Sequence, residues 1–252
     1  MTGHVVFVGA GPGDPELITL RGWRELKEAE VVLYDSLVDD RLLDGLDAEL
    51  APVGKRCGRH SVPQEKITEM LVHYAFKGKR VVRLKGGDPT VFGRTGEEAL
   101  ALAAAGISFE IVPGISSALA APAFAGIPVT HRGIADSVCI VSAHRQDDRN
   151  DFSIPPYSPR RTLVLLMAAR TATAWLEQLR SRGYPSTLPL AFVTAATTPQ
   201  QTVHVTTIEE AMDSGVTAEL RSPAMAVIGH VVTLRGSLAW HSSDPVLEAL
   251  QA

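Results

Sequence analysis

Three short turns rich in glycine and proline carry residue types that bind small molecules. They are Gly9-Ala-Gly-Pro-Gly-Asp14, Lys85-Gly-Gly-Asp-Pro89 and Pro113-Gly-Ile-Ser-Ser117. Each follows an apolar run typical of a strand, and the glycines let a ligand approach the backbone closely. Because ligands of an open parallel sheet bind outside the carboxyl ends of its strands, we expect all three turns at one edge.

The first turn matches a dinucleotide-binding loop only in part. The third glycine of such a loop would fall at position 14, where the sequence has Asp14, and Pro12 removes a backbone N–H. Pyrophosphate binding depends on N–H groups at a helix start, and a carboxylate there repels phosphate. The turn therefore favours an uncharged or cationic ligand, and a plain strand–helix turn is the alternative interpretation.

The charge of the chain is low on average and uneven along the sequence. The 252 residues include 24 Lys and Arg and 28 Asp and Glu, and the formal net charge of −4 disfavours a nucleic-acid-binding protein. Residues 55–94 alone hold 10 basic and 3 acidic side chains. This block is either a solvated face or a pocket for a polyanion. Cys57 and Cys139 are too few for a disulfide framework or a multi-cysteine zinc site.

The elements that must position these turns alternate between strand and helix in the first half. An α/β domain with a parallel-rich sheet is therefore predicted for residues 1–114. Its helix from Pro63 has Ser61 as a candidate cap. Strands are predicted at 5–8, 31–34, 50–53, 81–84 and 109–112, and helices at 19–28, from 63 to Gly78, and at 97–105.

Residues 115–252 predict a second α/β domain, with a mixed sheet. Runs at 189–193 and 202–206 have no helix between them, which predicts antiparallel pairing, and the polar stretch 147–161 is predicted to be a mobile surface loop. No apolar run reaches the roughly 20 residues of a membrane span, and an apolar strand begins at Val5, so we expect a cytoplasmic protein without a signal peptide. The other expected elements are strands at 137–142, 162–167 and 224–229, and helices at 116–124, 172–182 and 208–213.

Several segments resemble one enzyme family. The run from Val8 to Leu20 (VGAGPGDPELITL) is similar to the opening motif of the tetrapyrrole methylases, which use S-adenosylmethionine (SAM). Other segments resemble the branch of that family that methylates uroporphyrinogen III, in its stand-alone form. They are Tyr34–Val38, Gly54–Gln64, Arg83–Pro89, Phe92–Arg94, Gly96–Glu98 and Gly126–Gly133.

The resemblance implies methylation of uroporphyrinogen III at C2 and C7, giving precorrin-2 through precorrin-1 for sirohaem or cobalamin biosynthesis. It also implies SAM as methyl donor, S-adenosylhomocysteine (SAH) as product, no metal, and a homodimer. A reduced pyrrole carbon is electron-rich and attacks the methyl group directly, so positioning supplies most of the acceleration. A proton must still leave the macrocycle, which requires acid–base assistance.

The resemblance assigns five catalytic candidates. Asp35 is the implied proton acceptor and Lys55 the proton donor, although Asp35 also suits a turn cap and Lys55 a substrate carboxylate. Arg94 and Arg132 match arginines at the substrate cleft, since guanidinium groups suit the eight carboxylates of the substrate. Glu97 is spaced to orient Arg94, with an ordinary surface ion pair as the alternative.

The resemblance further implies one SAM site in a cleft between the two domains, to which both contribute. Met167, taken alone, would be interpreted as core filler. The ten implied cofactor-binding residues are Pro12, Gly86, Gly87, Asp88, Val91, Ser117, Ala118, Met167, Ala196 and Ala224.

Three other functions compete with this interpretation. A sister enzyme would methylate a later corrin precursor, against which the Gly54–Gln64 segment argues. An NAD-dependent oxidoreductase is disfavoured by Pro12 and Asp14, and a non-catalytic tetrapyrrole carrier by the retained catalytic candidates. Five positions depart from the usual family pattern: Thr90, Thr95, Ala143, Thr194 and His230.

Overall fold

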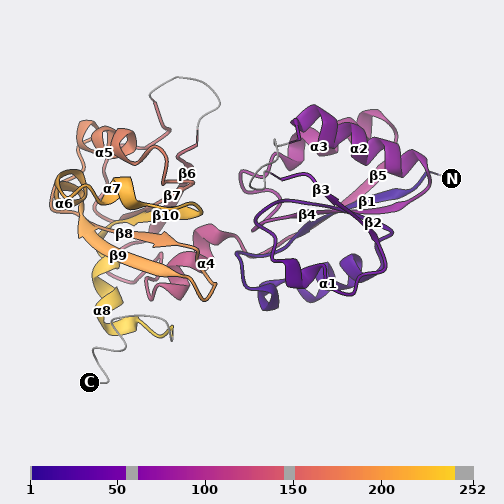
Figure 1. Cartoon of the computed structure of the whole chain (residues 1–252). Coiled ribbons are helices and arrows are strands. Elements are labelled where there is room, and N and C mark those ends of the chain that lie inside the picture. Colours follow the sequence, from indigo (N-terminus) through magenta and orange to yellow (C-terminus); the bar gives the residue numbers. More distant parts are fainter. Residues whose placement is uncertain (1, 55–61, 145–150, 242–252) are drawn as a thin grey trace. The chain divides into compact units, whose positions relative to one another are not determined.

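The structure is a computed structural model that describes residues 2–54, 62–144 and 151–241. The chain divides into two compact units, Met1–Ser117 and Ala118–Ala252. The sequence predicted a boundary near residue 114. Each unit is built around its own five-stranded sheet (Figure 1).

The sequence predicted a parallel-rich sheet for the first unit, and the sheet observed there is fully parallel. Its strand order is β3-β2-β4-β1-β5, with β4 paired to both β1 and β2 in parallel register. Parallel neighbours place the carboxyl ends of all five strands at one edge. The strands are β1 (His4–Gly9), β2 (Val31–Tyr34), β3 (Glu49–Pro52), β4 (Arg80–Lys85) and β5 (Ser108–Val112).

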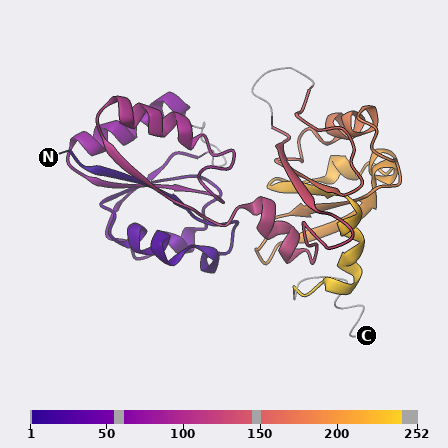
Figure 2. The ribbon, with the colours of Figure 1, turned by 180° about the vertical axis from the view of Figure 1, so that it is seen from behind.

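Helices cover both faces of this sheet: α1 (Leu20–Lys27) lies on one face, and α2 (Gln64–Phe76) and α3 (Thr95–Ala104) lie on the other (Figures 1 and 2). Alternate strand residues divide between the two layers. Val6 packs on the α1 side, and Val5 packs with the α2–α3 side. Thr19 caps α1 by accepting the Gly22 N–H at 3.0 Å. Pro63 occupies the cap position of α2 without a side-chain hydrogen bond, and the predicted cap Ser61 lies outside the described residues.

The second unit contains a mixed sheet of order β6-β7-β10-β8-β9. Strands β6 and β7 are parallel, whereas β10 is antiparallel to both β7 and β8. The predicted antiparallel pairing of β8 with β9 is confirmed. The strands are β6 (Ser137–Ser142), β7 (Arg161–Leu166), β8 (Pro189–Thr194), β9 (Thr202–Thr207) and β10 (Ala224–Ile228).

Helix α5 (Ala172–Ser181) packs on one face of this sheet, where its Trp175 side chain contacts the ring of Phe192 at 5.8 Å between centroids. Figure 1 shows α4 (Ser117–Phe124) and α8 (Arg235–Leu238) on the opposite side of the sheet from α5. Helix α6 (Ile208–Asp213) was predicted. Helices α7 (Val216–Glu219) and α8 were not, because four residues are too few to display a helical period.

Residues 151–160 form no helix or strand, as predicted for a loop, and most of them are exposed or half-buried, but two of their side chains are buried. Phe152 and Ile154 are buried in the hydrophobic core beside α5. The Phe152 N–H donates to the side-chain oxygen of Gln178 at 2.8 Å. Two apolar residues among prolines and polar residues were enough to anchor this segment. No helix within the described residues is both long enough and apolar enough to cross a membrane.

Candidate active site

The turns that follow β1 and β4 are hydrogen-bonded to each other. Gly87 donates its N–H to the Gly11 carbonyl at 2.7 Å, and Gly11 donates to the Gly87 carbonyl at 3.3 Å. The Ala10 N–H donates to the Lys85 carbonyl at 2.8 Å. The backbone pairing of the sheet therefore continues beyond the strand ends, and the two turns form one unit at the carboxyl edge.

The third turn packs against this unit through Gly114. A Cβ atom on Gly114 would lie 2.3 Å from the Gly87 carbonyl oxygen and 2.7 Å from the Gly9 Cα. No side chain fits at such distances, so glycine is required at this contact. The three turns converge on one edge of the first sheet, as predicted.

Asp88 joins the second turn to the third. Its Oδ2 accepts the Gly114 N–H at 3.0 Å, and its Oδ1 accepts the Thr90 N–H at 2.8 Å and the Thr90 hydroxyl at 2.5 Å. The buried Thr95 hydroxyl donates to the Pro89 carbonyl. Thr90 and Thr95 therefore both stabilise this turn. Asp88 therefore holds the turn in shape, whatever further contact it makes with a ligand.

The remaining first-unit candidates for cofactor binding lie around the same turns. Gly86 and Gly87 are half-buried, and Gly87 has a φ of 68°, which favours glycine. The Val91 N–H donates to the Asp88 carbonyl at 3.2 Å. A Cβ on Gly87 would lie 3.7 Å from the Ser117 backbone nitrogen, so Ser117 faces this turn.

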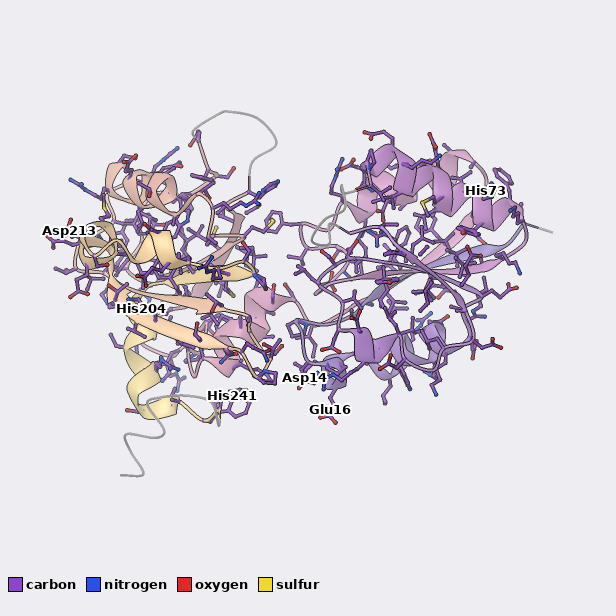
Figure 3. All side chains as sticks on the ribbon, in the orientation of Figure 1. Asp14, Glu16, His73, His204, Asp213 and His241 are labelled. Atoms are coloured by element: carbon purple, nitrogen blue, oxygen red, sulfur yellow. The ribbon has the colours of Figure 1, made fainter. Side chains whose placement is uncertain are left out.

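The carboxylate of Asp14 has a local structural role. It accepts the Glu16 N–H at 3.0 Å and caps the 3₁₀ helix Pro15–Leu17. Figure 3 shows Asp14 and Glu16 together in the turn after β1, at the opposite end of the unit from His73 of α2. Pro12 is half-buried in the same turn.

Asp35 follows β2 at the same edge and is paired with a buried arginine. Its Oδ1 accepts a hydrogen bond from Arg83 Nη2 at 2.5 Å, and its side chain remains 31% exposed. Its N–H donates to the Leu84 carbonyl at 3.2 Å, which fixes its backbone to β4. The chain after β3 also reaches this place, because a Cβ on Gly54 would lie 2.1 Å from the Ser36 nitrogen. Lys55, the residue after Gly54, lies outside the described residues.

A buried charge cluster lies behind Asp35, and the sequence interpretation did not identify it. Arg83 Nε lies 3.3 Å from Glu98 Oε1, and Lys85 Nζ lies 2.9 Å from Glu98 Oε2. The Gln64 amide donates to Glu98 Oε1 at 2.7 Å. Burial lowers the pKa of Lys85, and the neighbouring Arg83 charge lowers it further. We name these four residues with Asp35 the Arg83 cluster.

The sequence contained a signal for this cluster. In the strand Val81-Val-Arg-Leu-Lys85, alternate residues point to one face, so Arg83 and Lys85 share the face of Val81 toward α2 and α3. Glu98 precedes Leu102 by one helical turn and so lies on the buried stripe of α3. Two cations in a buried strand require buried anions, and Glu98 was the acidic residue in the matching position.

Arg94 and Glu97 form the predicted ion pair on the surface. Arg94 donates through Nε at 2.8 Å and Nη2 at 2.7 Å to the two carboxylate oxygens of Glu97. This pairing raises the pKa of Arg94 and lowers the pKa of Glu97. Arg94 adopts a left-handed conformation, φ 57°, immediately before α3. Phe92, two residues earlier, is also left-handed, with φ 53°. Such strain in residues other than glycine is typical of functional sites.

Three predicted cofactor residues of the second unit lie at one edge of its sheet. The Ala168 N–H donates to the Ala224 carbonyl at 3.0 Å, and the Ala195 N–H donates to the Pro223 carbonyl at 3.0 Å. Met167 and Ala196 are the neighbours of these donors in the chain. Met167 is 44% exposed, so it is not the core filler that its residue type alone suggests.

Backbone strain is concentrated at this second edge as well. Met167, Ala195 and Thr197 have φ values of 58°, 44° and 66°. A hollow of about 540 Å³ adjoins the edge, within the size range of ligand pockets. Its lining includes Phe192, Thr194, Ala195, His204, Arg221 and Pro223.

The other second-unit candidates are placed differently. Arg132 is exposed in the turn between α4 and β6. Ala118 is fully buried in α4, so any contact with a ligand is restricted to its surroundings. Ala143 is also fully buried, and His230 lies 3.4 Å from the Tyr157 hydroxyl. In the three described stretches of the chain, no group of three or more His, Cys, Asp or Glu side chains is arranged to hold a metal ion.

Comparison with known proteins places this geometry in one family. The family model described as tetrapyrrole (corrin/porphyrin) methylases matches residues 4–212. The chain is 45% identical over 245 residues to a siroheme synthase of Nitrosospira multiformis, covering 96% of this chain and 52% of that protein. It therefore spans about half the length of the curated relatives that it matches.

Solved structures agree with this match. A uroporphyrin-III-C-methyltransferase from Thermus thermophilus is 43% identical, with a TM-score of 0.80 over 95% of this chain and 98% of that one. A second structure of a Thermus thermophilus uroporphyrin-III C-methyltransferase, complexed with S-adenosylhomocysteine, is 40% identical, with a TM-score of 0.76 over 92% of this chain and all of that one. The chain belongs to the tetrapyrrole methylase family.

Proposed function

We propose that this chain transfers two methyl groups from SAM to uroporphyrinogen III, at C2 and then C7, to give precorrin-2 through precorrin-1. The observation that supports this most is the likeness, over 95% of the chain at 43% identity, to a uroporphyrin-III-C-methyltransferase of Thermus thermophilus. The product would serve sirohaem or cobalamin biosynthesis, and siroheme synthases are among the relatives.

The residues at the first sheet edge fit the sulfonium cofactor SAM better than a cofactor that contains a pyrophosphate. Pro12 offers no N–H, and carboxylates of Asp14 and Asp88 lie in the turns that form this edge. Such a charge distribution favours a cation over a pyrophosphate. Gly86 and Gly87 are only half-buried, and a Cβ on either would have no atom closer than 3.3 Å, so a small ligand can approach the backbone there. A SAH complex is known for a 40% identical relative, which supports SAM as the donor here.

SAM supplies an electrophilic methyl group, and the tasks that remain belong to the protein. In each transfer a pyrrole carbon forms the new C–C bond, the bond from sulfur to methyl breaks, and a proton leaves the macrocycle. We assign acceptance of that proton to Asp35, which is partly exposed and held by Arg83. Lys55 is the proposed proton donor.

Substrate recognition is assigned to arginines. Arg94 is 42% exposed at the side chain and already oriented by Glu97 in a two-bond geometry. Because a guanidinium has five N–H donors and Glu97 accepts from two of its nitrogens, Arg94 can still donate hydrogen bonds to a substrate carboxylate. Arg132 is exposed and is proposed for the same purpose. We propose the remaining cofactor contacts for Pro12, Gly86, Gly87, Asp88, Val91, Ser117, Ala118, Met167, Ala196 and Ala224.

Calorimetry and methylation assays with individual substrates test this proposal. SAH should bind the purified chain, and NAD(P) should not. When uroporphyrinogen III and its monomethylated and dimethylated products are offered separately with SAM, only the first two should accept a methyl group. Methylation of the dimethylated compound alone would instead favour an enzyme that acts on a later corrin precursor. A homodimer in the cytoplasm is also proposed, and light scattering after gel filtration tests the dimer.

A further inference from the structure

The Arg83 cluster is a charged group built into an otherwise apolar layer. Its side chains are 3% exposed for Arg83, 3% for Lys85 and 0% for Glu98, whereas Asp35 is 31% exposed. Two cations and two anions give no net charge. Asp35 is therefore the charged group of the cluster that reaches solvent, and it does so at the candidate active site.

Stability alone gives no reason for this arrangement. Moving an ion from water into a protein interior costs several kcal/mol, and apolar residues of similar volume often replace buried ion pairs without loss. The same face of the sheet is filled by Val81, Leu71 and Leu102, so apolar packing was an available solution. A buried charged group beside a candidate catalytic carboxylate calls for a functional explanation.

The contacts of Arg83 fix its guanidinium in one orientation. Nη2 donates to Asp35, Nε to Glu98 at 3.3 Å, and Nη1 to the carbonyls of Leu33 at 3.4 Å and Leu84 at 3.3 Å. Each nitrogen of the planar group has an acceptor, so a rotation that improved one contact would lose another. The position of Asp35 Oδ1 is thereby tied to the position of Glu98.

Glu98 is fixed in turn by two further donors. Lys85 Nζ holds Oε2 at 2.9 Å, and the Gln64 amide holds Oε1 at 2.7 Å. These contacts connect α2, α3 and β4 to the carboxylate at the end of β2. Lowering of the Lys85 pKa by burial agrees with a lysine that is shielded from water.

We infer that Glu98 and Lys85 are positioning residues for Asp35, acting through Arg83. The inference rests on the proposed function, in which Asp35 accepts the proton released by the substrate. Other charged groups whose electrostatic field reaches the cluster are Glu97, which feels the charge of Lys85, and Arg94, which feels the charge of Glu98. They are exposed at the surface, so water weakens their effect on the cluster.

The test compares four variants with the wild-type chain. Glu98→Gln removes one buried anion, and the double variant Glu98→Gln/Lys85→Met also removes the cation that faces it. Gln64→Met removes only the amide that donates to Glu98. It tests whether the position of Glu98 affects catalysis if Glu98→Gln does not fold. Glu69→Gln is the matched control, because Glu69 lies on the exposed face of α2 and pairs with Lys66. Each protein is assayed for folding, SAH affinity, KM and kcat with uroporphyrinogen III.

We expect Glu98→Gln to lower kcat at least tenfold, since a small misplacement of a reacting group is costly. KM and SAH affinity should stay within about threefold, because Glu98 itself is fully buried and does not touch a ligand. In Glu98→Gln, Lys85 and Arg83 repel each other without their shared anion. The double variant should therefore recover kcat at least threefold over the single one. Gln64→Met should lower kcat about threefold, and Glu69→Gln should leave it unchanged.

Two results would overturn the inference alone. One is a wild-type enzyme that methylates uroporphyrinogen III together with a Glu98→Gln or Gln64→Met variant that folds and keeps its full kcat. The other is a double variant whose kcat is no higher than that of Glu98→Gln, which indicates a merely structural role. Absence of methyl transfer by the wild-type chain would instead overturn the proposed function, and the inference with it.

Discussion

Replacing Gly114 by alanine should disturb the three converging turns without adding charge or polarity. The new Cβ would lie 2.3 Å from the Gly87 carbonyl oxygen and 2.7 Å from the Gly9 Cα, and ordinary contacts begin near 3.4 Å. The turns must therefore separate by about 1 Å, counting only the shortest contact. Both of the obstructing atoms belong to backbone, which cannot rotate away as a side chain can.

The cost follows from this overpacking. Added volume in a packed region destabilises a protein by about 1–3 kcal/mol, which corresponds to a fall in Tm of about 2–12 °C for a chain of this size. Because the same turns are proposed to bind the cofactor, SAH affinity should fall at least tenfold, or about 1.4 kcal/mol. Thermal unfolding and calorimetric titration with SAH measure the two effects separately.

Gly96→Ala provides the matched control. Nothing lies within 4 Å of the Cβ that it would add in α3, and alanine in a helix is favoured over glycine by up to about 1 kcal/mol. Its Tm should be equal to or above that of the wild-type chain, with unchanged SAH affinity. The packing argument is refuted if Gly114→Ala retains both the wild-type Tm and the wild-type SAH affinity.

Three further predictions concern Asp88, Arg94 and Tyr184. Asp88→Ala removes the acceptor of three hydrogen bonds and should cost about 2 kcal/mol in urea unfolding, whereas Asp88→Asn, which keeps one oxygen, should cost less; equal losses would contradict this role. Arg94→Ala should lose at least tenfold in kcat/KM with SAH affinity within threefold, and normal turnover would exclude Arg94 from substrate recognition. Burial raises the pKa of Tyr184 from 10.0 to about 12, so the unfolded chain loses this proton first and stability falls as the pH rises from 10 to 12. By pH 11 the loss should be about 1.4 kcal/mol in the wild-type chain and absent in Tyr184→Phe; parallel curves for the two proteins would contradict this origin.

The sheet architecture of both units was predictable because its strands are marked by short apolar runs between turn residues. The run at 31–34 became β2 with the predicted bounds. The two runs that became β8 and β9 are connected by a loop without a crossover helix, and this indicated antiparallel pairing. The burial of Phe152 and Ile154 was not predictable. The composition of a segment shows that it is polar on average, but it does not show where its two apolar side chains pack.

The first sheet edge was predicted from its glycines, but the arrangement of its charges was missed. The basic block at 55–94 suggested a pocket for a polyanion. Arg83 and Lys85, which belong to that block, instead point into the interior and pair with Glu98. A count of charges along the chain cannot distinguish a strand's buried face from its exposed edge. The roles of Asp35, Lys55 and Arg94 stay predictions, and so does the sharing of one ligand by residues of both units.

The mass of the product tests the central claim most directly. The purified chain is incubated anaerobically with SAM and enzymatically generated uroporphyrinogen III, and the tetrapyrrole is analysed by mass spectrometry beside a reaction without SAM. We predict a product heavier by two methyl groups, preceded in time by one heavier by a single methyl group. Recovery of the unmethylated tetrapyrrole alone, from a chain that is folded and binds SAH, would contradict the proposed activity.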